Sequence, residues 1–478
     1  MRKTTIVPLL LLACLAISVL PMTRIVRSSS HVYLSRDVSP YKEQLVDTTA
    51  GLEATYRSRW GWWIDMVDAD LVTNNGQGIY VAVLDTGLLS NYLDYFPADI
   101  VDIKEEWGKG FSYKETWDPA INDYAETWDP DRGFITNAQG SGHGTHVTSI
   151  ITGFRPSATS LNWYKGVAPK VTIIPVLVLD TWWLDCPDPT YPGYHDGKVL
   201  WKGGSYEMVA AGIDYIADLA EEHGIKIIIS MSLGGAVPGG IEEVAINYAI
   251  SKGVIVVASA GNNGEFGMGW PGAYPQVISA AACGWTDYWY YYYVSGGYWW
   301  EGQGAYPGLD VPEKLNTKDH LGNNWQTFLE DFSSRPNPNY VYGTFQTSQS
   351  KKDLDVCAPG QAIIGPYKPY ISWNTQTLKW VNPVIGTYLV WGTSQAAPHV
   401  AGIAALVAQS YPDLSQSSME WILKKAAGQC PLPSDGAGCY DLAPYWYDFY
   451  WNDHDYGNGL LQAPAALKWA DTYNNMIG

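Results

Sequence analysis

Charged residues are scarce in this chain, and basic residues are the scarcest of them. Charged side chains make up 16% of the 478 residues, against roughly 25% in average soluble domains. The 29 Lys and Arg residues are outnumbered by 48 Asp and Glu, which gives a formal net charge of −19. Because an acidic surface repels phosphate groups, we expect no nucleic-acid partner.

Cysteine is also rare, with six residues and no CxxC or His–Cys spacing of the kind that holds zinc. Cys430 and Cys439 flank the turn-rich segment PLPSDGAG. We predict a disulfide between them, which an exported protein would permit. We expect the other three downstream cysteines to be buried free thiols; they are Cys186, Cys283 and Cys357.

Long apolar runs are absent after the N-terminus. Arg2 and Lys3 precede an uncharged, largely apolar run over residues 4–22. This pattern predicts an export signal over residues 1–23, with an uncleaved membrane anchor as the alternative. We therefore expect a secreted or extracytoplasmic protein that touches a membrane only through this segment. Residues 24–58 are polar and weakly patterned, which predicts an extension before one domain at 59–478.

Short runs rich in Val and Ile alternate with helical patterns in the remaining chain. Such runs suit strands buried on both faces of a parallel sheet. The expected strands cover residues 79–84, 171–179, 225–231 and 254–258, and the expected helices 205–223 and 241–252. Strand and helix in alternation predict an α/β fold, a doubly wound and mostly parallel sheet with helices on both faces.

Four stretches interrupt this alternation, and we interpret them as surface insertions on one domain. They cover residues 109–142, 180–204, 285–324 and 362–391. The first contains ETWDP twice and many acidic residues, which favours a solvated loop. The third opens with WTDYWYYYYVSGGYWW. Since aromatic side chains chiefly bury area, we expect it to pack as a hairpin, with a role in lining an extended cleft as the alternative.

Polar residues stand where the expected strands end. Asp85 closes the first run in AVLDTGL, and Asn262 follows the fourth in ASAGNNG. Ligands of doubly wound sheets bind beyond these carboxyl ends, although each residue also suits an ordinary strand-end turn. His143 and His146 lie in GSGHGTHV. Either ring could serve as a general base near neutral pH, or both could be structural.

Small residues surround Ser394 in GTSQAAPHVAG. If Thr393 or Ser394 caps a helix through HVAGIAALVAQS, Pro398 falls in its early turns, where the helix loses at most about one hydrogen bond. A backbone amide near Ser394 would then be left to donate toward the crevice. The pattern therefore predicts a serine displayed at the start of a helix.

These ordered motifs resemble those of the subtilisin-like serine peptidases. The matching segments are VLDTG, HGTHV, GVAP, MSLGG, AGNNG, GWPGAYP, DFSS, LDVCAPG, GTSQAAPHVAG and YGNGLLQAPAAL, spread over residues 59–470. The resemblance implies that Ser394 is the nucleophile, His143 the general base and Asp85 its orienting acid. It also implies that Asn262 and the Ser394 amide form an oxyanion hole, in the mechanism for which this family is a worked example.

The same resemblance implies how substrate binds. Ser232, Leu233 and Gly234 would pair with an extended protein or peptide substrate and wall its main specificity pocket, while Asn263 and Gly269 would lie near the base. No charged residue stands among these five, so we expect large apolar side chains to be preferred before the scissile bond. The resemblance also suggests a cis Trp270–Pro271 peptide bond and a monomer.

Calcium is the point at which the match to the family weakens. Asp94 matches a calcium ligand of the family, but the usual loop of further ligands is not recognisable after the His143 segment. The chemistry itself needs no cofactor, so any calcium ion would be structural. The acidic insertion at residues 109–142 offers oxygen ligands as an alternative. Two other functions remain to be tested, a binding protein on the same scaffold and a transpeptidase that excludes water from the acyl-enzyme.

Overall fold

The structure is a computed structural model, and it describes most of the chain. The described residues are 43–45, 58–59, 61–118, 123–160, 162–185, 194–285, 316–318, 324–374, 376–432, 435–442 and 445–477. The predicted signal at 1–23, most of the extension at 24–58, Cys186 and the aromatic run after Trp285 lie outside them. Within the described part, no helix combines the length and the apolar character that crossing a bilayer requires.

A central sheet of eleven strands organises the fold. Its order is β15-β16-β14-β13-β12-β3-β9-β5-β6, with β19 beside β14 and β4 beside β9. The four predicted runs form neighbouring strands β13 (Ile255–Ser259), β12 (Ile227–Met231), β3 (Tyr80–Asp85) and β9 (Thr172–Leu177). All three contacts between these strands are parallel. Their side chains are almost all buried, as continuous runs of Val and Ile predict.

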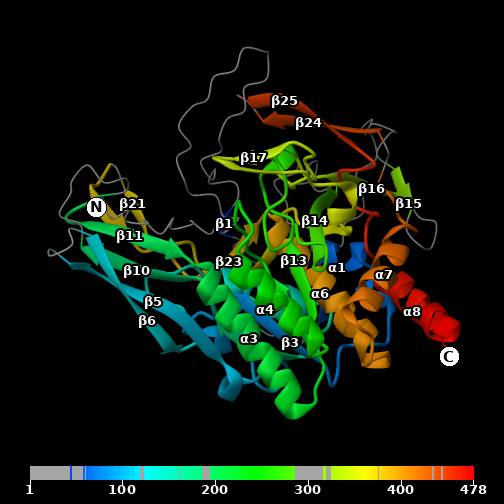
Figure 1. Cartoon of the computed structure of the whole chain (residues 1–478), viewed down its shortest axis with the longest axis horizontal. Helices are drawn as coiled ribbons and strands as arrows, with labels where there is room; N and C mark the ends of the chain where they lie inside the picture. The colour runs from blue at the N-terminus through cyan, green and yellow to red at the C-terminus, as the bar shows by residue number, and fades with distance from the viewer. Residues whose placement is uncertain are drawn as a thin grey trace, which may run out of the picture.

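Helices pack on both faces of this sheet, which confirms the predicted α/β class. Helices α3 (Tyr206–His223) and α4 (Gly240–Ser251) pack against each other on the face toward the viewer in Figure 1. Helix α6 (Thr393–Ser410) lies behind the sheet in this view, and α2 (His143–Thr152) packs against it. Ser205 caps α3 as expected, because its hydroxyl accepts from the Met208 amide at 3.3 Å.

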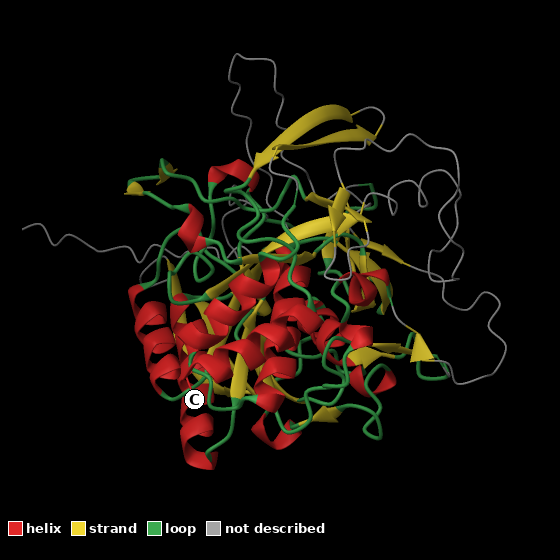
Figure 2. Ribbon diagram, turned by 90° about the vertical axis from the view of Figure 1, so that its right-hand side faces the viewer, coloured by secondary structure: helices red, strands yellow, loops and turns green. Residues whose placement is uncertain are grey.

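Smaller elements surround this core. The remaining strands of the main sheet are β4 (Asp102–Ile103), β5 (Lys109–Asp118), β6 (Asp123–Arg132), β14 (Ile278–Trp285), β15 (Asn316–Lys318), β16 (Asn324–Leu329) and β19 (Val356–Pro359). Three-stranded sheets are formed by β1 (Glu43–Leu45), β23 (Gly386–Val390) and β20 (Ile363–Tyr367), and by β2 (Ser58–Arg59), β8 (Trp163–Lys165) and β7 (Gly153–Phe154). The hairpins are β10 (Asp180–Asp185) with β11 (Lys198–Gly203), β17 (Tyr340–Tyr342) with β18 (Phe345–Thr347), β21 (Ser372–Asn374) with β22 (Lys379–Val381), and β24 (Asp435–Leu442) with β25 (Tyr445–Asn452). The further helices are α1 (Trp62–Met66), α7 (Gln416–Ala427) and α8 (Ala463–Ile477). Hairpin β24–β25 projects from the top of the molecule in both views (Figures 1 and 2).

The acidic insertion is a hairpin, so the prediction of a solvated loop was wrong. Strands β5 and β6 pair antiparallel, and β5 also joins the main sheet by parallel pairing with β9. The two ETWDP repeats meet in this hairpin only at their first residues, Glu115 and Glu126, which lie opposite one another. Pairing between β5 and β6 satisfies the backbone of this polar sequence, and only Lys109 and Gly110 pair with β9.

The cysteines agree with the predictions as far as the described residues reach. Cys283 and Cys357 are buried free thiols on the neighbouring strands β14 and β19. Cys430 is buried as well. The side chain of Cys439 lies outside the described residues, so the disulfide between Cys430 and Cys439 stays a prediction. The division into extension and single domain also stays a prediction.

Candidate active site

The predicted site residues meet at the carboxyl edge of three adjacent strands. Asp85 is the last residue of β3, Ser232 follows β12 directly, and Asn262 lies three residues beyond β13. Since these strands are parallel neighbours, their ends open onto one crevice. Helix α6 packs against all three strands and begins close to Ser394.

A buried carboxylate holds the first imidazole of the site. His143 is the first residue of α2, and its Nδ1 lies 2.8 and 2.9 Å from the two carboxylate oxygens of Asp85. Both side chains are fully buried. A Cβ on Gly144 would stand 2.4 Å from the Gly87 carbonyl oxygen, so only glycine allows α2 to approach β3 this closely. The His143 Nε2 has no hydrogen-bond partner among the described residues, which leaves it available for proton transfer.

The other two buried histidines have structural contacts. His146 Nε2 donates to the Ile363 carbonyl at 3.0 Å, and His399 Nδ1 donates to the Gln395 carbonyl at 2.7 Å. Burial lowers the pKa of His146 to about 3, with a further contribution from His143, and it lowers the pKa of His399 to about 3. Both rings therefore stay neutral near pH 7. Of the two rings in HGTHV, only His143 lies against a carboxylate.

Ser394 lies in the first turn of α6, where a proline changes the hydrogen bonding. Neither Thr393 nor Ser394 is the cap that we predicted, because Gly392 precedes the helix and Thr393 is already helical. Pro398 lacks the N–H that would bond the Ser394 carbonyl four residues earlier. The Ser232 hydroxyl donates to that carbonyl instead, at 2.7 Å. Because Pro398 cannot donate, the Ser394 carbonyl remains free to accept from Ser232, and this bond fixes the start of α6.

Ser232 also holds the Ser394 hydroxyl. This hydroxyl donates to the Ser232 carbonyl at 3.2 Å, and no hydrogen bond joins it to His143 within the described part of the chain. Hydroxyls move between staggered rotamers, and catalytic hydrogen bonds often form fully only when substrate binds. The early position in α6 also leaves the Ser394 amide without an intrahelical acceptor.

Asn262 is oriented by the residue before the serine. Its Oδ1 accepts from both the amide and the hydroxyl of Thr393, each at 2.9 Å. The Thr393 hydroxyl in turn accepts from the Gly261 amide at 3.1 Å. With the oxygen engaged, the NH₂ group is turned toward the start of α6, where a Cβ on Gly392 would lie 3.3 Å from Asn262 Nδ2. A side-chain donor and the Ser394 amide thus both lie at the start of α6.

The expected substrate-binding residues lie along the same crevice. The Gly234 N–H and carbonyl bond to no described residue, so both are open to an extended peptide. Gly235 and Trp270 exchange backbone bonds of 2.7 and 2.9 Å, which ties this segment to Gly269. The Trp270–Pro271 bond is cis, as predicted. Asn263 is fixed separately, because its amide donates to the Ser334 hydroxyl at 2.9 Å.

No described residue adds to the case for calcium. Asp94 lies in a short 3-10 helix (Tyr92–Asp94), and its carboxylate accepts from the Asn91 side chain at 3.1 Å. Within the described residues, no three Asp, Glu, His or Cys side chains converge as metal ligands would. Calcium at Asp94 therefore stays a prediction.

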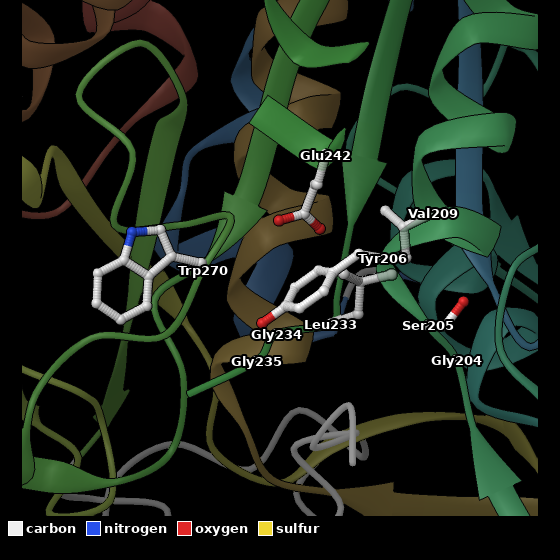
Figure 3. A pocket seen from close by; sticks show the side chains of 9 residues that line it. All are labelled: Gly204, Ser205, Tyr206, Val209, Leu233, Gly234, Gly235, Glu242 and Trp270. Atoms are coloured by element: carbon white, nitrogen blue, oxygen red, sulfur yellow. The ribbon is translucent and has the colours of Figure 1, made fainter. Parts of the chain in front are cut away.

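Sequence reasoning missed a buried acid beside the crevice. Glu242 in the first turn of α4 is 1% exposed and lines a small hollow together with Leu233 and Gly234 (Figure 3). The signal was present in the helix pattern, since Glu242 falls on the buried stripe with Ala245, Ile246 and Ala249. A helix pattern counts an acid as exposed, so Glu242 was not among the predicted site residues.

Fold and crevice define an α/β protein in which an Asp–His pair and a serine at a helix start lie at one edge of the sheet. Residues 76–459 match the family model described as Subtilase family, in the S8 group of peptidases, so the chain belongs to the subtilase family of serine endopeptidases.

The sequence and the structure of the chain are similar to those of several known proteins. The chain is 28% identical over 347 residues to a subtilisin of Bacillus sp. (strain TA39), covering 72% of this chain and 59% of that protein. It is 28% identical over 333 residues to thermitase of Thermoactinomyces vulgaris, covering 70% of this chain and 76% of that protein. Among solved structures, sphericase is 25% identical and covers 84% of this chain and 97% of its own, with a TM-score of 0.48.

Replacing Asn262 tests its amide. We expect Asn262→Leu to lower kcat by about 10²- to 10³-fold with little change in KM, because the donor acts on charge that develops only in the transition state; subtilisin is the system in which this magnitude was established. Thr393→Val should cause a smaller loss, since it removes one of the two donors that orient the amide. An unchanged kcat in folded Asn262→Leu protein would exclude the role.

Proposed function

We propose that the chain cleaves internal peptide bonds through an acyl-enzyme formed on Ser394. The observation that carries the proposal is the buried Asp85–His143 pair at 2.8 Å, at the strand edge where Ser394 is fixed by Ser232. Family membership supports protein or peptide substrates. Asp85 orients His143 and stabilises its protonated form, so that the free Nε2 faces the reaction.

In the proposed acylation step, the Ser394 oxygen attacks the carbonyl carbon while its proton passes to His143 Nε2. The developing oxyanion accepts from the Asn262 NH₂ group and the Ser394 amide. The carbon–nitrogen bond then breaks, and His143 gives the proton to the leaving amine. Water repeats the sequence in reverse: it loses a proton to His143, adds to the ester, and releases the acid as Ser394 regains its proton.

We propose that substrate lies extended along Ser232, Leu233 and Gly234. The open N–H and carbonyl of Gly234 support this, because they can pair with one substrate residue as in a strand. The side chain before the scissile bond would then reach toward Gly269 and Asn263. Main-chain pairing of this kind supplies affinity without sequence preference, so specificity depends on the pockets beside it.

Cleavage-site mapping tests the predicted preference. We expect digestion of a denatured protein to enrich Phe, Tyr, Leu or Met about 10-fold before the cut over Asp, Glu or Lys, because burying an apolar side chain in a pocket is worth about 1.5–3 kcal/mol. Products would be mapped by mass spectrometry, with Ser394→Ala protein as the blank. Enrichment of a charged residue at this position would refute the preference.

Location, assembly and metal content are further proposals. The basic and apolar start of the chain supports export, with anchoring by residues 1–23 as the alternative. We also propose a monomer, and a structural calcium ion at Asp94 if any is bound. Thermal unfolding with and without a calcium chelator, together with the mass of the protein in solution, tests both.

A further inference from the structure

The hollow beside Leu233 contains an acid that the proposed reaction does not use. Its lining comes from Gly204 to Tyr206 and Val209 at the start of α3, from Leu233 to Gly235, from Glu242, and from Trp270. The volume is about 20 Å³, which suits one small polar group such as a water molecule or an ammonium. In Figure 3 the carboxyl group of Glu242 points between the rings of Trp270 and Tyr206.

No positively charged side chain among the described residues compensates the buried carboxyl group of Glu242. Its Oε2 has no hydrogen-bond partner within the described part of the chain. The nearby phenols of Tyr206 and Tyr274 donate elsewhere, to the carbonyls of Val237 and Gly239. Burial raises the pKa of Glu242 to about 8. A buried acid in this state gains free energy from any hydrogen-bond donor that enters, and most from a cation.

The hollow is separate from the pocket predicted for the side chain before the scissile bond. It shares Leu233 and Gly234 with that pocket, but neither Asn263 nor Gly269 lines it. It is lined instead by residues at the start of α3, from Gly204 to Tyr206 and Val209. A substrate peptide extended along Gly234 therefore passes two pockets, the predicted one near Gly269 and this hollow. Successive side chains of a strand point to opposite sides, so different substrate residues would reach the two pockets.

We propose that Glu242 makes this hollow a specificity pocket for a lysine side chain of the substrate, two to four residues from the scissile bond. The lysine stem would pass along Tyr206 and Trp270, whose aromatic faces attract cations. The ammonium would donate to the open Oε2. The hollow favours lysine over arginine, because a planar guanidinium with five donors exceeds the space. This inference rests on the proposed function.

The pocket should work better at alkaline pH. Glu242 must lose its proton to pair with an ammonium, so the lysine preference should rise as pH increases through about 8. The titratable groups around it are Tyr206 and Tyr274, whose phenols stay protonated there, and Glu243 on the same helix; Tyr340 and Tyr342 interact with Tyr206 in turn. The pKa of Tyr206 and of Tyr274 is raised by burial and then by Glu242 itself, so neither phenol competes as a charge.

A peptide scan tests the proposal. Each peptide has one Phe before the intended cut and either Lys or norleucine, its uncharged counterpart, at one position from five residues before the bond to three after. For the wild type at pH 9, we expect kcat/KM to favour Lys over norleucine by about 10- to 100-fold at a single position, as for other buried charge pairs. The ratio should fall toward one at pH 6.

Two variants give the scan its controls. Glu242→Gln keeps the shape but loses the charge, so the Lys preference should vanish or reverse; Glu243→Gln on the same helix should keep it. A ratio near one at every position in active wild type, or one that survives in Glu242→Gln, overturns the proposal while leaving the endopeptidase assignment intact. Failure to cleave any peptide by folded wild type would instead refute the proposed function.

A stability measurement checks the buried acid without substrate. Because the folded-state pKa of Glu242 is raised above its ordinary 4.5, folding retains its proton, and stability is lost as pH rises from about 4.5 through about 8. The Tm of Glu242→Gln should therefore exceed that of the wild type at pH 9 and match it at pH 5. An equal Tm at both values would show that the carboxyl is not buried as described, and would overturn the proposal.

Discussion

Ser394→Ala should abolish peptide hydrolysis, with kcat falling by about 10⁶-fold. Subtilisin, a member of this family, is the system in which the loss was established, so the magnitude is carried over from that relative. The physical reason is that the neighbouring hydroxyls are already engaged: that of Thr393 donates to Asn262 Oδ1 at 2.9 Å. Ser232 cannot replace it, because its own hydroxyl is committed to the Ser394 carbonyl at 2.7 Å.

A second serine on the same helix provides the control. Ser410 ends α6, is exposed, and accepts from the Asn74 side chain at 2.9 Å. Ser410→Ala should hydrolyse a chromogenic peptide at the wild-type rate. Both variants should unfold at nearly the wild-type temperature, which shows that the loss is chemical. Hydrolysis by Ser394→Ala above one per cent of the wild-type rate would be incompatible with a Ser394 acyl-enzyme.

Asp85→Asn should lower kcat by about 10⁴-fold while KM changes little. In the structure both Asp85 oxygens lie within 2.9 Å of His143 Nδ1, so the ring must carry its proton on Nδ1 and present a bare Nε2 to Ser394. An amide at this position can donate to Nδ1 and thereby favour the opposite tautomer, which cannot accept the serine proton. The size of this effect is that of the serine protease on which the triad was worked out.

An acid outside the crevice is the matched control for this experiment. Asp102 lies on β4, is exposed, and accepts from the Thr172 hydroxyl at 2.6 Å. Asp102→Asn should leave kcat within about two-fold of the wild type, since single surface changes of this kind alter little. Full activity in Asp85→Asn would mean that His143 acts without an orienting carboxylate, contrary to the buried pair.

The central strands could be predicted because their signal is local. The runs that became β3, β12 and β13 were placed within two residues of their ends, since strands buried on both faces read as continuous Val and Ile. The positions of Asp85 and Asn262 followed from those ends. Hairpin β5–β6 could not be predicted, because its strands are polar and carry no apolar pattern; its link to β9, through Lys109 and Gly110, joins segments more than sixty residues apart.

Contacts of the site were less predictable than its residue types. The motifs named Ser394, but the cap at Gly392 and the exchange of two hydrogen bonds with Ser232 depend on how α6 meets β12. Glu242 was missed for the opposite reason, since its charge suggested solvent while the packing of α3 and α4 buries it. A residue's chemistry can be taken from its motif, whereas its burial depends on segments that the motif does not contain.

Covalent labelling with an organophosphonate tests most directly whether these groups form one reactive site. The account predicts a single adduct, located by peptide mass spectrometry on Ser394, formed rapidly by the wild type and at least 10³-fold more slowly by folded His143→Ala protein. An adduct on any other residue, or equal labelling of the two proteins, would contradict the joint action of His143 and Ser394.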